Sequence, residues 1–112
     1  MTATQNNQVK YLFNSKGNWI AFKKGKYVFS KNGNWIGWTP WDDKDVYTKN
    51  GKYFGTITNG DRLYYYRNYR YRGYPGYPGY PGYPGYPGYP GYGGYSPLPP
   101  GAQDISIETV EN

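Results

Sequence analysis

The stretch KYVFSKNGNWIGW (26–38) occurs in three related forms in the first half of the chain. KYLFNSKGNWIAF (10–22) precedes it and KDVYTKNGKYFGT (44–56) follows it, and the three stretches match position by position. Each has a short aromatic or β-branched run, then a turn rich in Asn, Ser, Lys and Gly, then a second aromatic run, which is typical of a β-hairpin. No apolar stripe with helical spacing persists, so the pattern disfavours a helix.

A fourth copy begins at RLYYYRNYRYRG (62–73). Leu63 aligns with the valines of the earlier copies, and Asn68 stands at the position of the turn glycine. Asn is the residue that best replaces Gly where the backbone takes a positive φ. The second half of this copy departs from the pattern. We therefore interpret residues 9–72 as four hairpins, with closure by the fourth left open.

The apolar positions of the repeat predict how the hairpins assemble. One hairpin is not stable alone in water, so the four must bury their apolar faces together, most simply as a ring about a pseudo-four-fold axis. Small residues at one aligned position predict close approach of backbones near the centre; they are Ala21, Gly37 and Gly55. The residues expected at the axis are Leu12, Val28, Val46 and Leu63, with Ile20, Ile36 and Phe54 behind them.

The composition excludes several classes of protein. The chain has 112 residues, a formal charge of +6, and neither Cys nor His, so disulfides, thiol nucleophiles and imidazole chemistry are excluded. No signal peptide pattern or membrane-spanning apolar run is seen, so we expect a cytoplasmic protein with a disordered N-terminus over residues 1–8. We interpret the positive charge mainly as a means of solubility, and nucleic acid is a disfavoured partner.

The repeated [YV]-[LV]-[FY]-x-x-x-G-x-[WY]-[IF]-[AG], followed by a Pro-rich tail, resembles the bacterial four-fold β-flower domain family. The motif is seen here as YLFNSKGNWIA, YVFSKNGNWIG and DVYTKNGKYFG. The resemblance covers about residues 9–72 and implies a small all-β flower of four petal hairpins, without an activity to transfer. The stretch GKYVFSKNGNWIGW is also loosely similar to choline- and glucan-binding repeats of bacterial cell-wall proteins.

Residues 73–101 form a low-complexity tail that begins with six Gly-Tyr-Pro triplets. Proline favours extended geometry, so we expect a disordered or polyproline II segment. Three interpretations stay open: a solvated linker, a multivalent tail whose tyrosines contact arginines or partner surfaces, and a short collagen-like triple helix. The contact residues of the second would be Tyr74, Tyr77, Tyr80, Tyr83, Tyr86 and Tyr89, with Arg67, Arg70 and Arg72.

The acidic segment 102–112 alternates apolar with polar residues in DISIETVEN. Such alternation predicts a strand that adds to an exposed sheet edge. Its acids, Asp104, Glu108 and Glu111, could also dock on the basic hairpins.

Aromatic side chains are the candidates for ligand binding, and they are Trp19, Trp35, Trp38, Trp41 and Tyr53. Trp19 and Trp35 hold equivalent repeat positions, which favours a place in the core. Trp38 and Trp41 flank the loop TPWDD, which only the second copy has, and functional residues concentrate on such loops. Asp42 and Asp43 in this loop lack the frame of a calcium site, so we interpret them as a solvated turn.

The sequence thus predicts an all-β β-flower with an extended tail and no catalytic residues, metal or cofactor. We expect a non-enzymatic structural or interaction protein that forms homo-oligomers through multivalent contacts. The alternative is a carbohydrate or cell-envelope binding module that uses exposed aromatic residues, with a glycan or another protein as partner.

Overall fold

The computed structural model describes residues 9–41 and 44–107. The expectations for residues 1–8, Asp42, Asp43, Glu108 and Glu111 fall outside this part of the chain. The described residues form eight strands and no helix. The strands are β1 (Val9–Phe13), β2 (Trp19–Lys24), β3 (Tyr27–Ser30), β4 (Trp35–Trp38), β5 (Asp45–Tyr47), β6 (Tyr53–Thr58), β7 (Arg62–Tyr66) and β8 (Ala102–Gln103).

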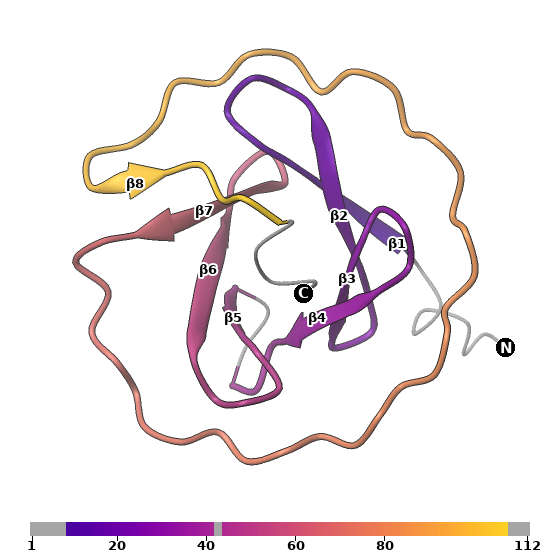
Figure 1. The fold of residues 1–112 in the computed structure, drawn as a ribbon. Helices are drawn as coiled ribbons and strands as arrows, with labels where there is room; N and C mark the ends of the chain where they lie inside the picture. The colour runs from indigo at the N-terminus through magenta and orange to yellow at the C-terminus, as the bar shows by residue number, and fades with distance from the viewer. Residues whose placement is uncertain (1–8, 42–43, 108–112) are drawn as a thin grey trace, which may run out of the picture.

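The strands pair antiparallel in chain order from β1 to β8, and β1 also pairs with β7. This last pairing closes the ring, with Phe13 opposite Arg62 and the Phe13 N–H donating to the Asp61 carbonyl at 2.9 Å. The all-β fold with four petals about a common axis is therefore confirmed (Figure 1). In the described ranges, no helix has the length and apolar character that crossing a membrane requires.

The first three petals share one turn geometry. Each turn glycine has a φ that L side chains rarely adopt: 87° at Gly17, 89° at Gly33 and 89° at Gly51. The side-chain oxygen of the first residue of each turn accepts hydrogen bonds from backbone N–H groups later in the turn; these residues are Asn14, Ser30 and Thr48. These bonds add to the backbone hydrogen bonds across each turn, such as Ser30 N–H to the Asn34 carbonyl at 2.8 Å, and together they hold the turn tight.

The core at the axis is the one that the repeat predicts. Leu12, Val28, Val46 and Leu63 have no exposed surface, and Ile36 and Phe54 pack in the same cluster. Ile20 is partly buried against it. A Cβ on Gly37 would lie 2.6 Å from the Tyr47 carbonyl oxygen, and one on Gly55 would lie 2.9 Å from that of Tyr64. The small residues therefore permit neighbouring petals to approach, as expected.

The fourth petal differs from the sequence interpretation, which placed its second strand before residue 73. Its first strand is β7, but the partner is β8, with Tyr65 opposite Gln103 and Tyr66 opposite Ala102. The polar run after β7 has no apolar side chains to offer the axis, whereas the segment after β8 brings Ile107 into the core with Ile105 packed against it. The strand that the alternation in DISIETVEN predicts does not form in the described part of that stretch, residues 104–107; the strand that is added, Ala102–Gln103, lies directly before it.

Residues 67–101, called the belt below, connect β7 to β8 by running once around the four petals (Figure 1). The belt returns to its start, where the Arg67 N–H donates to the Gly101 carbonyl at 3.0 Å. It contains neither helix nor strand. Its triplet glycines have φ between 83° and 107°, so the chain leaves polyproline II geometry at every third residue. These glycines are what turn an extended segment into a circle.

Candidate functional site

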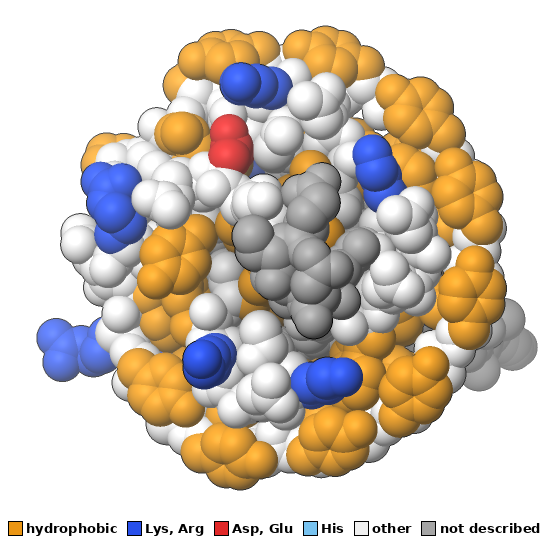
Figure 2. Space-filling model, viewed as in Figure 1, with side chains coloured by type: hydrophobic (Ala, Val, Ile, Leu, Met, Phe, Trp, Pro, Cys, Tyr) orange, Lys and Arg blue, Asp and Glu red, His pale blue; other side chains and the backbone are white. Residues whose placement is uncertain are grey.

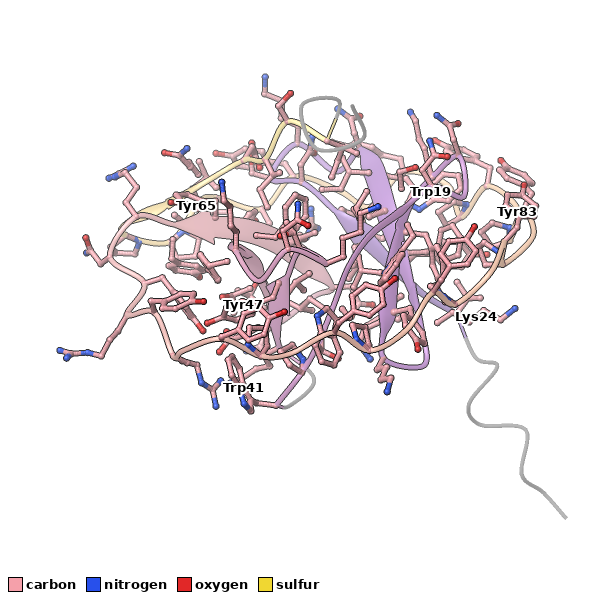
Figure 3. The ribbon with its side chains drawn as sticks, turned by 60° about the horizontal axis from the view of Figure 1, so that its bottom comes forward. Trp19, Lys24, Trp41, Tyr47, Tyr65 and Tyr83 are labelled. Atoms are coloured by element: carbon pink, nitrogen blue, oxygen red, sulfur yellow. The ribbon has the colours of Figure 1, made fainter. Side chains whose placement is uncertain are left out.

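The outward faces of the petals carry a second aromatic layer. Neighbouring residues in a strand point to opposite faces, so Ile36 faces the axis while Trp35 faces outward. Trp19, Phe22 and Phe29 are buried in this outer cluster, and other rings are partly buried against it. We define the head as residues 9–66 together with 102–107. The belt covers the outer aromatic layer of the head, and Figure 3 shows Trp19 on the head and Tyr83 on the belt at the same edge of the molecule.

The tryptophan at the aligned repeat position of each of the first two petals lies against two successive tyrosines of the belt. The ring centroids are 6.0 Å apart in both pairs of Trp19 and 5.8 and 5.7 Å apart in those of Trp35. Each indole N–H donates to a carbonyl two residues on, of Ala21 at 2.7 Å and of Gly37 at 2.9 Å. This bond fixes the indole plane and leaves its outer edge for the belt. The pairs are Trp19 with Tyr86 and Tyr89, and Trp35 with Tyr77 and Tyr80.

The turn glycines of the petals lie under other tyrosines of the belt. A Cβ on any of them would come within 2.5 to 2.8 Å of a ring carbon, so each glycine leaves the space that a ring fills. The three tyrosines are nine residues apart, which equals three triplets for each petal. The pairs are Gly17 with Tyr92, Gly33 with Tyr83, and Gly51 with Tyr74.

A third contact follows the same interval of nine. The Tyr11 hydroxyl donates to the Pro87 carbonyl at 2.8 Å, and the Tyr27 hydroxyl donates to the Pro78 carbonyl at 3.3 Å. Tyr11 and Tyr27 hold the same position in their petals. The belt therefore runs opposite to the petal order and repeats its contacts once per petal.

Asp45 of the third petal binds the start of the belt. It holds the repeat position that Tyr11 holds in the first petal. Its carboxylate accepts a hydrogen bond from the Tyr69 hydroxyl at 3.2 Å and pairs with the Arg72 guanidinium at 2.7 Å. The Tyr69 ring stacks on Tyr53, with centroids 3.6 Å apart and planes at 1°. Burial, the hydrogen bond with Tyr47 and the charge of Asp45 all raise the pKa of Tyr69 well above its ordinary value.

The fourth petal holds the end of the belt through Arg62, again at the same petal position. This arginine is 7% exposed. One terminal nitrogen donates to the carbonyls of Asn14 and Gly94, both at 2.8 Å, and the other donates to that of Gly93 at 2.7 Å. Beyond the belt, Asp104 accepts hydrogen bonds from the Ser15 N–H at 2.8 Å and the Ser15 hydroxyl at 2.6 Å. Arg62 and Asp104 thus fix the return of the chain to the head.

The belt leaves one side of each tyrosine exposed. Eight belt tyrosines, called the tyrosine rim below, are 58 to 71% exposed and follow one another at three-residue intervals. Figure 2 shows hydrophobic side chains along the top, right and bottom of the outline of the molecule, with Lys and Arg on the face within and at the left edge. The rim comprises Tyr74, Tyr77, Tyr80, Tyr83, Tyr86, Tyr89, Tyr92 and Tyr95.

The other aromatic candidates have different environments. Trp38 is 7% exposed, and its indole N–H has no hydrogen-bond partner among the described residues. Trp41 is 40% exposed, but the Arg72 guanidinium lies 4.6 Å from its ring centroid and the Tyr47 ring packs edge-on at 4.9 Å. The structure therefore does not bring Trp38 and Trp41 together with Trp19 and Trp35 in one exposed platform.

A cavity of about 630 Å³ lies between the belt and the first two petals. The rings of Trp19, Tyr86 and Tyr89 line it on one side, and polar side chains of the two petal turns line it on the other. The side-chain oxygens of Asn14 and Ser30 in this lining already accept hydrogen bonds from backbone N–H groups.

Sequence reasoning missed several residues that hold the belt. Arg62 appeared only as the start of a degenerate repeat, and Tyr92 and Tyr95 lie beyond the last full triplet. The spacing of Gly91-Tyr92 and Gly94-Tyr95 continues the three-residue interval, and this signal could have included them.

A comparison with known families matches residues 2–108 to the 4-fold beta flower protein family. No curated protein and no solved structure matches the chain. The family match spans nearly the whole sequence and agrees with the closed ring of four petals. The chain therefore belongs to the 4-fold beta flower protein family.

Proposed function

We propose that this chain is a non-enzymatic interaction protein that associates with further copies of itself through the tyrosine rim. One observation carries the proposal: eight tyrosines in fixed register surround the molecule with most of each ring exposed. Large exposed aromatic surface on a soluble protein marks an interaction site, and tyrosine contributes contact area at low entropic cost.

The energetics favour many weak contacts over one strong contact. An aromatic pair contributes about 0.5–1.5 kcal/mol, and an exposed cation–π contact about 0.5–1 kcal/mol. Arg67 and Arg70 are exposed at the start of the belt and supply cations for such contacts. One such contact does not hold two molecules together, but several between two rims do, because later contacts form within an assembled pair.

The acids of the described residues support a non-enzymatic role. Asp45 pairs with Arg72, Asp61 pairs with Lys10 at 3.0 Å, and Asp104 binds Ser15. Each carboxylate holds two parts of the fold together. The cavity beside Trp19 has no carboxylate in its lining, and the one beside Tyr53 and Tyr65 has Asp104 alone, whereas glycoside hydrolysis needs a pair of carboxylates.

The alternative, a carbohydrate or cell-envelope binding module, has weaker support. Belt tyrosines occupy the outer edges of Trp19 and Trp35, and Arg72 lies over Trp41. A sugar ring would have to displace these groups in order to stack. Self-association needs no such displacement.

Sedimentation velocity of three full-length proteins tests the proposal. The wild-type chain is expected to show a sedimentation coefficient that rises with concentration. Replacement by Ser of the four rim tyrosines that do not flank a tryptophan removes half of the rings from the rim, so this variant should associate much more weakly than the wild type; the positions are Tyr74, Tyr83, Tyr92 and Tyr95.

The matched control replaces the same four tyrosines by Phe, which keeps the rings and should keep the association. Circular dichroism checks that each variant retains its β signal. A wild-type chain that sediments as one monomeric species at every concentration would contradict the proposal. So would a folded Ser variant that associates like the wild type.

A further inference from the structure

We infer that the outer surface of the head is a binding groove for Gly-Tyr-Pro tracts, and that the belt of a second copy of this chain can occupy it. The inference goes beyond association through the rim, because it concerns the inner side of the belt. It assigns a peptide ligand to the surface formed by the turn glycines, the outward tryptophans, and Tyr11 and Tyr27.

The groove recognises three features of the tract in every nine residues. A tryptophan packs against two successive tyrosines, a tyrosine hydroxyl of the head donates to a proline carbonyl, and a further tyrosine ring fills the space over a turn glycine. The same three contacts occur in the first petal, nine residues further along the belt. Two independent copies of one contact set indicate recognition of the triplet itself.

Glycine and proline in the tract have separate roles. The glycines from Gly76 to Gly91 have φ of 83 to 95°, yet a Cβ on any of them would meet no atom within 4 Å. They are therefore required for backbone conformation and curvature, not for close approach. Proline has no N–H, so its carbonyl can bind the head without leaving a backbone donor of the same residue unsatisfied.

The middle of the belt is held differently from its ends. Backbone–backbone hydrogen bonds between the belt and the head, within the described residues, occur near the ends of the belt, at Tyr69, Gly93, Ser96 and Pro99. Between these ends, side chains of the head donate hydrogen bonds to proline carbonyls of the belt, from Tyr11, Tyr27 and Lys24. The middle can thus leave without breaking any β-ladder, and an identical segment can replace it.

A second copy is the occupant that the sequence itself supplies. The chain carries six Gly-Tyr-Pro triplets in residues 73–90, which match the contacts of two petals. Its own belt has the advantage of an effective concentration in the mM range, so it fills the groove in dilute solution. A second copy competes where the chain is concentrated to that range or where its own belt is weakened.

The test uses a full-length acceptor with a weakened belt and a synthetic peptide with the sequence of residues 73–101. In the acceptor, the four tyrosines that flank the tryptophans are replaced by Ser; they are Tyr77, Tyr80, Tyr86 and Tyr89. The control peptide carries the same four substitutions. Binding is followed by the anisotropy of the labelled peptide and by the emission of tryptophan.

The acceptor should bind the native peptide in a saturable manner and the control peptide at least about tenfold more weakly, because four ring contacts are lost. The wild-type chain should bind the native peptide much more weakly than the acceptor does. Equal binding of both peptides, or binding of neither by a folded acceptor, would overturn the inference.

If the acceptor alone lacks β structure, the same titration is read by circular dichroism. Recovery of the β signal with the native peptide only would support the inference, and no recovery would overturn it. The protein is kept at a concentration where the acceptor sediments as a monomer. The result therefore does not depend on whether the rim mediates association.

Discussion

At the scale of the residue, Gly33 serves the petal turn and the belt at once. Its φ of 89° is strained for any residue with a side chain, and its missing side chain leaves the space that the Tyr83 ring fills. Gly79 in the belt has a nearly equal φ of 91°, but a Cβ there would meet nothing within 4 Å. Substitution of Gly79 therefore measures the cost of backbone strain alone, and substitution of Gly33 measures this cost together with that of the overlap with Tyr83.

Gly33→Ala should lower the free energy of unfolding more than Gly79→Ala. The Gly79 change should cost about 1–2 kcal/mol through backbone strain alone. The Gly33 change adds about 1–3 kcal/mol, because the new Cβ overlaps a ring that must shift. Denaturant unfolding of the two variants and the wild type measures both values, and equal losses would show that Tyr83 does not rest on the turn.

At the scale of the element, the interval of nine residues per petal sets the length of the belt. Tyr80 packs on the tryptophan of the second petal and Tyr86 on that of the first, with only residues 81–85 to span the gap. Deletion of Gly82-Tyr83-Pro84 leaves two residues, Pro81 and Gly85, for the same arc. Both contacts cannot then persist.

This deletion should expose Trp19 or Trp35, shift tryptophan emission to longer wavelength, and destabilise the protein by about 1–3 kcal/mol for the two ring pairs that are lost. Tyr83→Ser is the matched control, since it removes the same ring and keeps the length. A deletion variant with the emission and stability of this control would disprove the register.

The sequence predicts the petals better than it predicts the belt, for a physical reason. Leu12, Val28 and their equivalents face one axis in every repeat, so alignment alone identifies the inner core. The belt has a low-complexity sequence. Its contacts repeat every nine residues because that length spans the arc between neighbouring petals, and this arc is set by the circumference of the folded ring. One signal was available: Trp35 and Ile36 are adjacent in a strand, so both cannot face the axis, and a large outward ring needs a second layer.

The prediction of the second strand of the fourth petal was wrong because the whole belt separates β8 from β7 in the sequence. Local pairing rules favour the nearest partner for β7, and RNYRYRG directly follows it. The assignment of ligand-binding residues stays a prediction. Tyr53, Trp19 and Trp35 do hold a segment of polypeptide, but that segment belongs to their own chain.

At the scale of the whole molecule, the ionisation of tyrosines makes the stability of the fold depend on pH in the alkaline range. Burial is the main cause that raises the pKa of Tyr53, Tyr66 and Tyr69 above 10.0. In the unfolded chain these groups titrate near pH 10, whereas in the folded protein they remain protonated to higher pH. Their contribution to stability is complete below about pH 10 and is lost as the pH rises toward the folded pKa.

The midpoint of thermal unfolding should therefore be insensitive to these tyrosines between pH 7 and about 9 and should fall progressively above about pH 10. Tyr69→Phe removes one of the three groups, so its midpoint should be lower than that of the wild type at neutral pH but should fall less steeply in alkali. Calorimetry across this pH range measures both curves. Parallel curves for the two proteins would contradict the role given to Tyr69.

The return of the belt to its starting strand also has a consequence for biosynthesis. A polypeptide leaves the ribosome from its amino end, so the first three petals emerge well before Ala102. Until then β7 is paired with β6 but lacks β8, so its end at Tyr65 and Tyr66 presents an unpaired edge, which is the kind of surface that promotes aggregation. Residues translated after the belt thus cover this edge, and a product terminated within the belt would leave it exposed.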